Sequence, residues 1–165
     1  MQVLVADDNL VFREVLKAML TGWGYQVVVV GNGAQALAQL EREDGPRLAV
    51  LDWAMPEIDG VEVCRLVRAA HRERYVYLLV LTAKTRLEDL VEAMEAGADD
   101  YVTKPFRSPE LVARLKTGSR IIDFEDRLVA SREHACKHAP NCHAAIPISG
   151  QSRPLHRLER RSAAP

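Results

Sequence analysis

The sequence has 165 residues (18.4 kDa), of which 48% are hydrophobic and 27% charged, and this balance excludes a wholly disordered or fibrous chain. No apolar run approaches the roughly 20 residues of a membrane-spanning helix, so we expect no membrane association and a cytoplasmic location. Residues 1–133 carry 17 Lys and Arg against 22 Asp and Glu, whereas residues 134–165 carry five against one. The acidic part argues against nucleic acid as a direct partner.

Short runs of β-branched residues alternate with amphipathic stretches along the first 120 residues. Five of these runs have the length and composition of strands: Val3–Ala6, Gln26–Val30, Leu48–Leu51, Val76–Leu81 and Tyr101–Val102. The third and fourth runs are apolar on both faces, as expected of strands covered by helices on each side. The alternation predicts an α/β fold, a doubly wound five-stranded parallel sheet with five helices, whose ligands bind beyond the carboxyl ends of the strands.

Polar residues follow the predicted strands at the points where a parallel sheet brings strand ends together. They are Asp7, Asp8, Asp52, Thr82 and Lys104. Three carboxylates in one pocket repel one another and raise their pKa values, so the pocket requires a divalent cation or a lysine. Ligation by carboxylate oxygens suits Mg²⁺, which keeps several waters and shares its shell with phosphate. Taken alone, Asp7 and Asp8 also fit a turn followed by a helix N-cap.

An aspartate beside a bound Mg²⁺ can attack a phosphoryl group, a reaction that needs mainly in-line positioning and neutralisation of the equatorial oxygens. Asp52 is the predicted nucleophile, because an apolar strand such as Leu48–Leu51 should not end in a charge beside two others without a purpose. Lys104 offers a point charge and Thr82 a hydroxyl to the phosphoryl oxygens, and Ala83 is small enough to leave the approach open.

With these residues in place, the first 120 residues resemble the response-regulator receiver family of two-component systems. The resemblance rests on four motifs in order: the Asp7-Asp8 pair, Leu51–Gly60, Leu81–Lys84 and Ala96–Phe106. Each motif alone is weakly specific, but all of them together at strand-end spacing are highly specific. The resemblance implies a flavodoxin-like receiver domain over residues 1–120, with strand order 2-1-3-4-5.

The resemblance also implies a function in phosphorelay signalling. Asp52 would be the phosphoacceptor for a sensor histidine kinase or a phosphotransfer protein, with Mg²⁺ as cofactor. Asp7, Asp8 and Asp52 would hold the metal together with the backbone carbonyl of Trp53. The chain would accept phosphoryl on its own aspartate and would not be an enzyme with a separate substrate. The alternative is a receiver-like scaffold that binds partners without being phosphorylated.

Receivers couple the phosphoryl site to a surface through a threonine and an aromatic residue that reorient together, here Thr82 and Tyr101. The surface formed by the fourth helix, the fifth strand and the fifth helix is therefore the expected output face, with homodimer formation expected on phosphorylation. The family also implies a cis Lys104-Pro105 bond. Two positions that vary among receivers and influence the lifetime of the phosphoryl group are Ala54 and Lys84 here.

The run Tyr77–Phe106 looks most like receivers that precede diguanylate cyclase output domains. The catalytic Gly-Gly-Asp/Glu-Glu-Phe signature of those cyclases is absent from this sequence. Cyclase activity is therefore not carried over to this chain.

The last predicted helix starts near Ser108 and continues beyond the receiver. Apolar residues at Ile121, Phe124 and Leu128 predict a helical extension over residues 121–133. This extension exposes apolar surface, so we expect it to pair with its copy in a dimer or to fray. Gly118 favours fraying.

Residues 134–165 contain four of the five His, four of the eight Pro and no aromatic residue, which predicts a disordered tail, a remnant of truncation or of a shifted reading frame. Several tail residues are metal-ligand types: His134, Cys136, His138, Cys142 and His143. Structural zinc sites pair cysteines two to four residues apart, and the wider gap between Cys136 and Cys142 favours a disordered tail over a zinc site.

Overall fold

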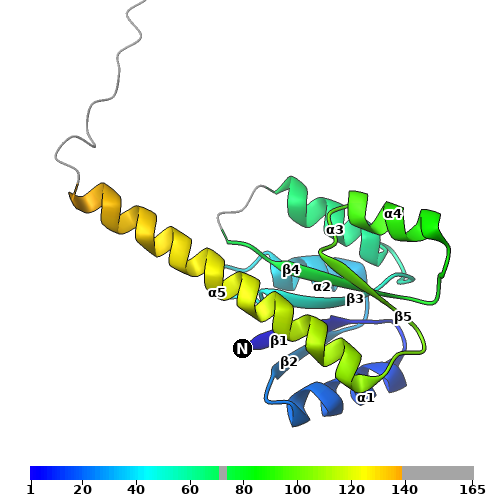
Figure 1. Cartoon of the computed structure of the whole chain (residues 1–165). Helices are drawn as coiled ribbons and strands as arrows, with labels where there is room; N and C mark the ends of the chain where they lie inside the picture. The colour runs from blue at the N-terminus through cyan, green and yellow to red at the C-terminus, as the bar shows by residue number, and fades with distance from the viewer. Residues whose placement is uncertain (71–73, 139–165) are drawn as a thin grey trace, which may run out of the picture.

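The computed structural model describes residues 1–70 and 74–138 (Figure 1). In this part of the chain, strands and helices alternate from end to end. The strands are β1 (Gln2–Ala6), β2 (Gln26–Val30), β3 (Leu48–Asp52), β4 (Tyr77–Thr82) and β5 (Asp100–Thr103). The helices are α1 (Leu10–Gly22), α2 (Gly33–Leu40), α3 (Gly60–Ala69), α4 (Leu87–Glu95) and α5 (Ser108–His138). All strand pairs are parallel and the order is β2-β1-β3-β4-β5, so the predicted flavodoxin-like fold is confirmed.

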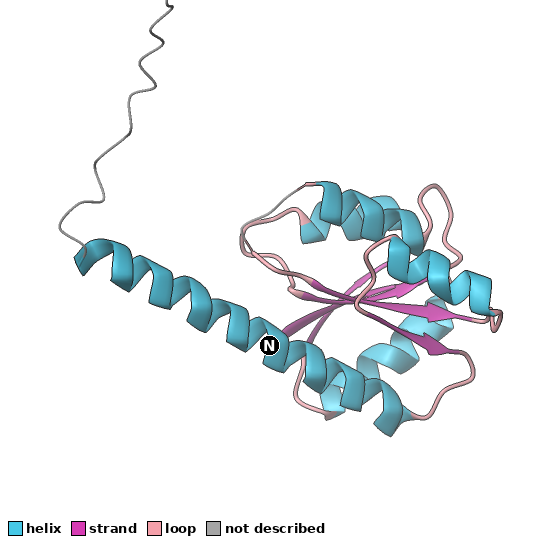
Figure 2. Cartoon of the chain, turned by 45° about the horizontal axis from the view of Figure 1, so that its top comes forward, coloured by secondary structure: helices cyan, strands magenta, loops and turns pink. Residues whose placement is uncertain are grey.

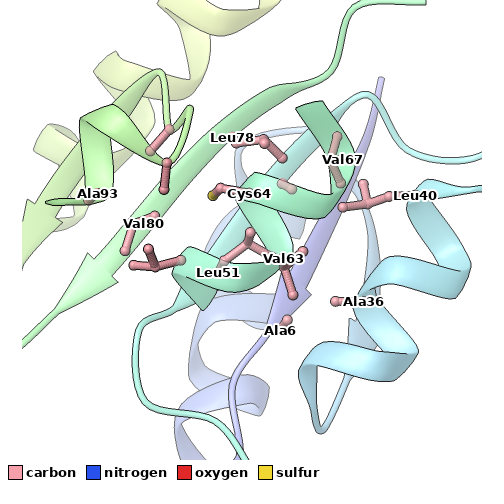
Figure 3. Packing of buried hydrophobic residues seen from close by; sticks show 14 of the residues in the cluster. Ala6, Ala36, Leu40, Leu51, Val63, Cys64, Val67, Leu78, Val80 and Ala93 are labelled. Carbon is pink, nitrogen blue, oxygen red and sulfur yellow. The ribbon is translucent and has the colours of Figure 1, made fainter. Parts of the chain in front are cut away.

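Helices cover both faces of the sheet (Figure 2). One buried apolar cluster joins α2, α3 and α4 to one face through residues such as Leu51, Val63 and Leu78 (Figure 3). A second cluster joins α1 and α5 to the other face, with Leu16 and Leu115 among its fully buried members. The central strands send alternate side chains into the two clusters, because successive strand residues point to opposite faces. As predicted, β3 and β4 are buried along their whole length.

Three helices begin at a polar side chain that accepts a hydrogen bond from the first helical turn. The cap residues of α1, α2 and α3 are Asn9, Asn32 and Asp59. Because Asn9 caps α1, the neighbouring Asp7 and Asp8 are not needed for that role. α4 differs from these helices, since its N-cap residue Arg86 makes no side-chain cap hydrogen bond.

Helix α5 is longer than predicted, because it continues five residues past the expected end at Glu133. Gly118 does not interrupt it. This residue is buried where α5 crosses the sheet, and a Cβ there would lie 2.5 Å from the Tyr77 ring and 2.8 Å from Leu48. Such a close crossing requires a residue without a side chain. Ile122, one turn further on, is also buried, so the exposed part of the helix begins later than predicted.

The last turns of α5 extend past the sheet (Figure 1). Arg47, in the turn before β3, ties them to the body of the domain through an ion pair with Asp126, with 2.6 Å between Nη1 and Oδ1. Phe124 and Leu128 are 62% and 39% exposed, as predicted. Ile121, in contrast, is half-buried against the cluster under α1 and α5. Pairing of this exposed surface with a second copy stays a prediction.

Among the described residues, no helix combines the length and the apolarity that crossing a bilayer requires. Residues 139–165, with Cys142 and His143, lie outside the described residues. The predictions of a disordered tail without zinc therefore stay predictions for that segment.

Candidate functional site

An acidic pocket lies at the carboxyl edge of the sheet. Asp7 and Asp8 follow β1, and Asp52 is the last residue of the neighbouring strand β3. One carboxylate oxygen from each residue lies within 4.8 Å of the others, a spacing that could hold a metal ion. Asp7 and Asp52 are 1% and 7% exposed, whereas Asp8 is exposed to solvent. The strand order thus brings the three carboxylates together, as predicted from their places after strands.

Lys104 reaches the same pocket from the loop after β5. Its Nζ lies 2.9 Å from Asp7 Oδ2 and 2.8 Å from Asp52 Oδ1, so the two buried carboxylates share one ammonium group. The Lys104-Pro105 bond is cis, as predicted. A lysine suits this position, because its ammonium is a compact charge with three donors on a flexible stem.

Burial and charge act against each other in this pocket. Burial is the main cause that raises the pKa of Asp52, against the hydrogen bond and the charge of Lys104. The like charges of Asp7 and Asp8 add to the rise. Burial alone would lower the pKa of Lys104, but its hydrogen bonds to Asp52 and Asp7 raise it overall. One lysine therefore does not balance three carboxylates, and the pocket favours an added cation.

The oxygens of the pocket fit a hard divalent cation. Asp7 Oδ2 and Asp52 Oδ1 accept from Lys104, and Asp7 Oδ1 accepts the Asn9 N–H at 2.9 Å. The second oxygen of Asp52 and the exposed carboxylate of Asp8 form no such bond within the described residues. A few carboxylate oxygens in a partly exposed pocket suit Mg²⁺, which keeps several waters in its shell.

The backbone carbonyl of Trp53, a predicted metal ligand, accepts a hydrogen bond from the Gly60 N–H at 3.0 Å. Gly60 approaches this turn so closely that a Cβ would lie 2.2 Å from the Asp52 carbonyl oxygen, which explains the glycine. One lone pair of the Trp53 oxygen is therefore used within the loop. Its part in a metal shell stays a prediction.

Thr82 and Tyr101, the predicted switch pair, line one cavity of about 340 Å³ beside the acidic pocket. Thr82 is buried at the end of β4, and its Oγ1 accepts the Lys84 N–H at 2.9 Å. Tyr101 is half-buried and packs against the cluster under α2, α3 and α4. The two side chains thus face a common space, and their joint movement stays a prediction.

Two contacts around the pocket were missed by sequence reasoning. Arg13 donates from Nη1 to the Asp7 backbone carbonyl at 2.6 Å. The ring of Phe12 lies with its centroid 4.3 Å from Lys104 Nζ. Both residues stand on the first turn of α1, directly after the acidic pair, and this position is the signal that could have identified them.

A larger cavity of about 580 Å³ lies at the amino ends of β3 and β4, with Pro46 and Val76 in its wall. It contains none of the acidic residues described above, and ligands of parallel sheets bind at the opposite edge. We therefore assign the function to the smaller acidic pocket.

The sheet order, the acidic pocket at the carboxyl edge and the lysine after the last strand define the class of this protein. Residues 3–116 match the family described as the response regulator receiver domain, and the chain belongs to that family. Such domains are the receivers of two-component systems.

A similar curated protein is the DNA-binding response regulator MtrA of Mycobacterium tuberculosis (strain H37Rv), 43% identical over 124 residues, which are 75% of this chain and 53% of MtrA. The chain spans about half the length of the curated relatives it matches. This relative carries a DNA-binding name, so it lends no support to the predicted likeness to receivers that precede cyclase domains.

Two solved structures are similar throughout the domain. The receiver domain of the Francisella response regulator 1452 has a TM-score of 0.67 and 29% identity, covering 72% of this chain and 96% of its own. The receiver domain of the sensor histidine kinase PA1611 from Pseudomonas aeruginosa PAO1 has a TM-score of 0.64 and 34% identity. The match covers 70% of this chain and 94% of the PA1611 receiver. The PA1611 structure has a magnesium ion coordinated in its active site cleft.

Proposed function

We propose that this chain is a phosphorelay receiver that takes up a phosphoryl group on Asp52, with Mg²⁺ as cofactor. The observation that carries the proposal is the Lys104 ammonium, 2.8 Å from Asp52 Oδ1, in a pocket of three carboxylates whose oxygens lie within 4.8 Å of one another. A phosphoryl transfer site needs this placement of charge more than it needs covalent chemistry. The donor is a sensor histidine kinase or a phosphotransfer protein, and the exchange takes place in the cytoplasm.

The transfer forms a bond between an Asp52 carboxylate oxygen and phosphorus, and it breaks the bond from phosphorus to the donor atom, which leaves with the electron pair. Lys104 neutralises charge on the phosphoryl oxygens, and Thr82 offers its hydroxyl to one of them. Mg²⁺ held by Asp7, Asp8 and Asp52 supplies further neutralisation when bound. The group stays on the chain's own aspartate, so the protein is not an enzyme with a separate substrate.

The output of the phosphorylated site is the face made of α4, β5 and α5. Thr82 gives up its bond with the Lys84 N–H to reach the phosphoryl group, and Tyr101 moves with it in the shared cavity. Homodimer formation through this face follows, supported by the exposed apolar residues of α4. These are Leu87, Val91 and Met94.

We also propose that the receiver controls a DNA-binding regulator rather than binding nucleic acid itself. The support is the name of MtrA, which is 43% identical over the receiver and about twice as long as the matched segment. The alternative output is a diguanylate cyclase domain, which the likeness of Tyr77–Phe106 to receivers that precede such domains favours.

Incubation of the full chain with acetyl phosphate tests the proposed phosphorylation. We expect one phosphoryl group per chain in MgCl₂ and none in excess EDTA, measured by intact mass spectrometry. Asp52→Ala should abolish the label, because it removes the nucleophile. The matched control is Asp59→Ala, which removes the exposed capping carboxylate of α3 and should keep the label.

Undiminished labelling of Asp52→Ala, or labelling of the parent chain in excess EDTA, would contradict this assignment. A parent chain that takes up no phosphoryl group from acetyl phosphate or from a kinase would instead favour the unphosphorylated scaffold.

A further inference from the structure

The cavity of about 340 Å³ lies between the acidic pocket and helix α4. Trp53 and Thr82 form its wall on the side of the pocket, and Leu87, Leu90 and Ala93 form its wall on the side of α4. The cavity is open to solvent on one side, where Lys84, Arg86 and Leu87 are exposed. The cavity therefore leaves α4 room to move towards the sheet.

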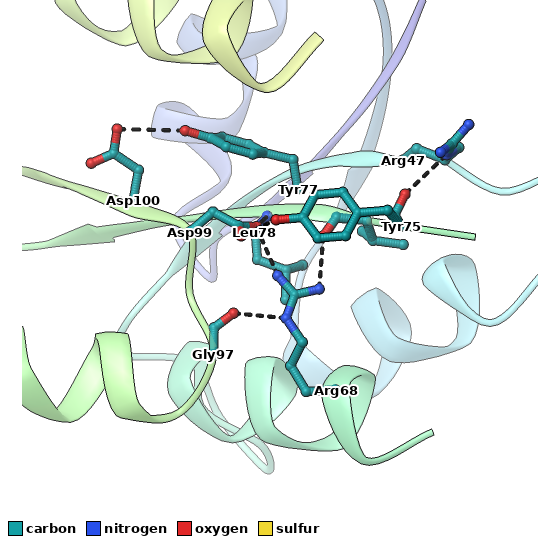
Figure 4. Close-up of polar contacts among 9 residues, drawn as sticks. Arg47, Arg68, Tyr75, Tyr77, Leu78, Gly97, Asp99 and Asp100 are labelled. Carbon is teal, nitrogen blue, oxygen red and sulfur yellow. Dashed lines mark hydrogen bonds and ion pairs between the residues drawn. The ribbon is translucent and has the colours of Figure 1, made fainter. Parts of the chain in front are cut away.

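Helix α4 is held differently at its two ends. At the C-terminal end the Gly97 carbonyl accepts the Arg68 Nε–H at 2.9 Å, and Ala96 is buried (Figure 4). At the N-terminal end the cap residue Arg86 makes no side-chain cap hydrogen bond. The first turn of α4 therefore depends on few contacts, and such segments open most easily.

Lys84 supplies the contacts of this first turn with the rest of the site. Its Nζ lies 3.8 Å from the centroid of the Trp53 ring and 3.2 Å from Asp89 Oδ1 on α4. Its backbone N–H donates to Thr82 Oγ1 at 2.9 Å. Trp53 is 8% exposed and follows Asp52 directly in the chain. One lysine thus links α4 to the residue beside the phosphoacceptor and to the switch threonine.

We propose that Lys84 is a positioning residue, which holds the first turn of α4 against Trp53 until Asp52 is phosphorylated and then moves from the Trp53 ring to the phosphoryl group. The inference rests on the proposed phosphorylation of Asp52. An aromatic face and a partly exposed carboxylate hold a cation weakly. A phosphoryl group with about two negative charges is the stronger partner.

The Thr82 hydroxyl also favours the release of Lys84 after phosphorylation. When its hydroxyl turns to the phosphoryl group, the hydrogen bond to the Lys84 N–H is lost, and the backbone of Lys84 is released together with its side chain. The first turn of α4 then loses its connection to Trp53 and can close over the cavity.

The fluorescence of Trp53 tests the contact in the full chain carrying Trp23→Phe, because the sequence has two tryptophans. Acetyl phosphate with MgCl₂ should change the Trp53 emission as Lys84 leaves the ring. Lys84→Met keeps a long side chain without the charge, and it should shift the unphosphorylated spectrum and remove about half or more of the phosphorylation-dependent change. Lys84→Arg should restore the unphosphorylated spectrum and the phosphorylation-dependent change, since a guanidinium also stacks on rings and pairs with carboxylates.

Hydrogen exchange adds a measurement on α4 itself. In the unphosphorylated chain, Lys84→Met should speed the exchange of the α4 amides about two- to fivefold, because the first turn opens more often. Asp89→Asn, which weakens only the ion pair, should give a smaller increase. The matched control is Arg86→Met: this guanidinium lines the same cavity but forms no ion pair or ring contact within the described residues, so both readouts should stay at parent values.

Mass spectrometry of the same samples separates this inference from the proposed function. A chain that takes up no phosphoryl group refutes the proposed function. Full labelling of Asp52, combined with parent emission and parent exchange in Lys84→Met, leaves the proposed function standing and refutes the role of Lys84.

Discussion

Two clusters of carboxylates and cations lie at opposite edges of the sheet, and they differ in how charge is balanced. At the amino ends of β4 and β5, three donors meet the single carboxylate of Asp99. They are Arg68 Nη2 at 2.7 Å, the Leu78 N–H at 2.7 Å and the Tyr75 hydroxyl (Figure 4). In the acidic pocket carboxylates outnumber donors, because within the described residues the Lys104 ammonium and the Asn9 N–H are the donors to three carboxylates.

The Asp99 cluster is saturated with hydrogen bonds. Arg68 also donates to the carbonyls of Gly97 and Val76, at 2.9 and 2.8 Å. The Tyr75 hydroxyl is protonated at neutral pH, and burial, followed by the bond to Asp99, raises its pKa further. Each charge in this cluster has a fixed partner, which suits a structural role. An excess of anions over cations, rather than the mere presence of acidic residues, distinguishes the candidate functional site.

Breaking the saturated cluster should have the largest effect on stability. Arg68→Met leaves Asp99 without its cation and two carbonyls without a donor, so the free energy of unfolding in urea should fall by about 3 kcal/mol. The matched control is Arg65→Met on the same helix, which removes exposed ion pairs with Glu62 and Glu92 and should cost less than about 0.5–1 kcal/mol. Equal losses for the two variants would show that the Asp99 cluster is not structural.

Removing the cation from the acidic pocket should have a smaller effect that depends on metal. Lys104→Met should lower the free energy of unfolding by about 1–2 kcal/mol in EDTA, because Asp7 and Asp52 lose their shared partner. MgCl₂ should recover most of this loss, since the bound ion replaces the missing charge. Urea unfolding with and without Mg²⁺ measures both the loss of stability and its recovery. The contrast between the clusters fails if Arg68→Met recovers as much stability from MgCl₂ as Lys104→Met does.

Removing an anion from the acidic pocket should have the smallest effect, with the opposite sign. Because burial raises the pKa of Asp52, the folded chain disfavours the ionised form at pH 7. Asp52→Asn should therefore raise the free energy of unfolding in EDTA by about 0.5–1 kcal/mol. The gain should shrink as the pH falls towards the folded pKa, where the parent carboxyl takes up a proton itself.

Urea unfolding in EDTA at pH 7 and pH 5 checks this third expectation. Asp99→Asn is the matched variant from the saturated cluster, and it should destabilise the chain, because its donors lose a charged acceptor. A destabilised Asp52→Asn chain would mean that the acidic pocket is balanced without a metal.

The acidic pocket could be predicted from the sequence, whereas the Asp99 cluster could not. Asp7, Asp52 and Lys104 each follow a strand, and in a parallel sheet a place at the end of a strand fixes a place at one edge. Asp99 meets Leu78 and Arg68, which lie 21 and 31 positions away along the chain. Asp99 and Leu78 lie at the amino ends of neighbouring strands, but no pattern in the sequence marks Arg68 on α3 as their partner, so the cluster appears only once this helix is packed.

Gly118 shows how local propensity and packing can disagree. A glycine inside a helical pattern lowers intrinsic helix stability, which favoured fraying. The Tyr77 ring beneath it reverses that conclusion, and the ring's position depends on the fold rather than on the neighbouring sequence. The expected end of the extension at Glu133 was too early: α5 continues to at least His138, and no Gly or Pro occurs between Gly118 and Pro140 to stop it sooner.

The close crossing at Gly118 makes α5 a lever with unequal arms. Ser108 is ten positions before this fulcrum and His138 is twenty positions after it, which corresponds to arms of about 15 and 30 Å at the rise of an α-helix. A rotation of about 5° at the fulcrum would move the far end by about 2.6 Å. The Arg47–Asp126 ion pair sits eight residues along the long arm and would be strained first. The same rotation would move the C-terminal end of α5 about twice as far as its N-terminal end.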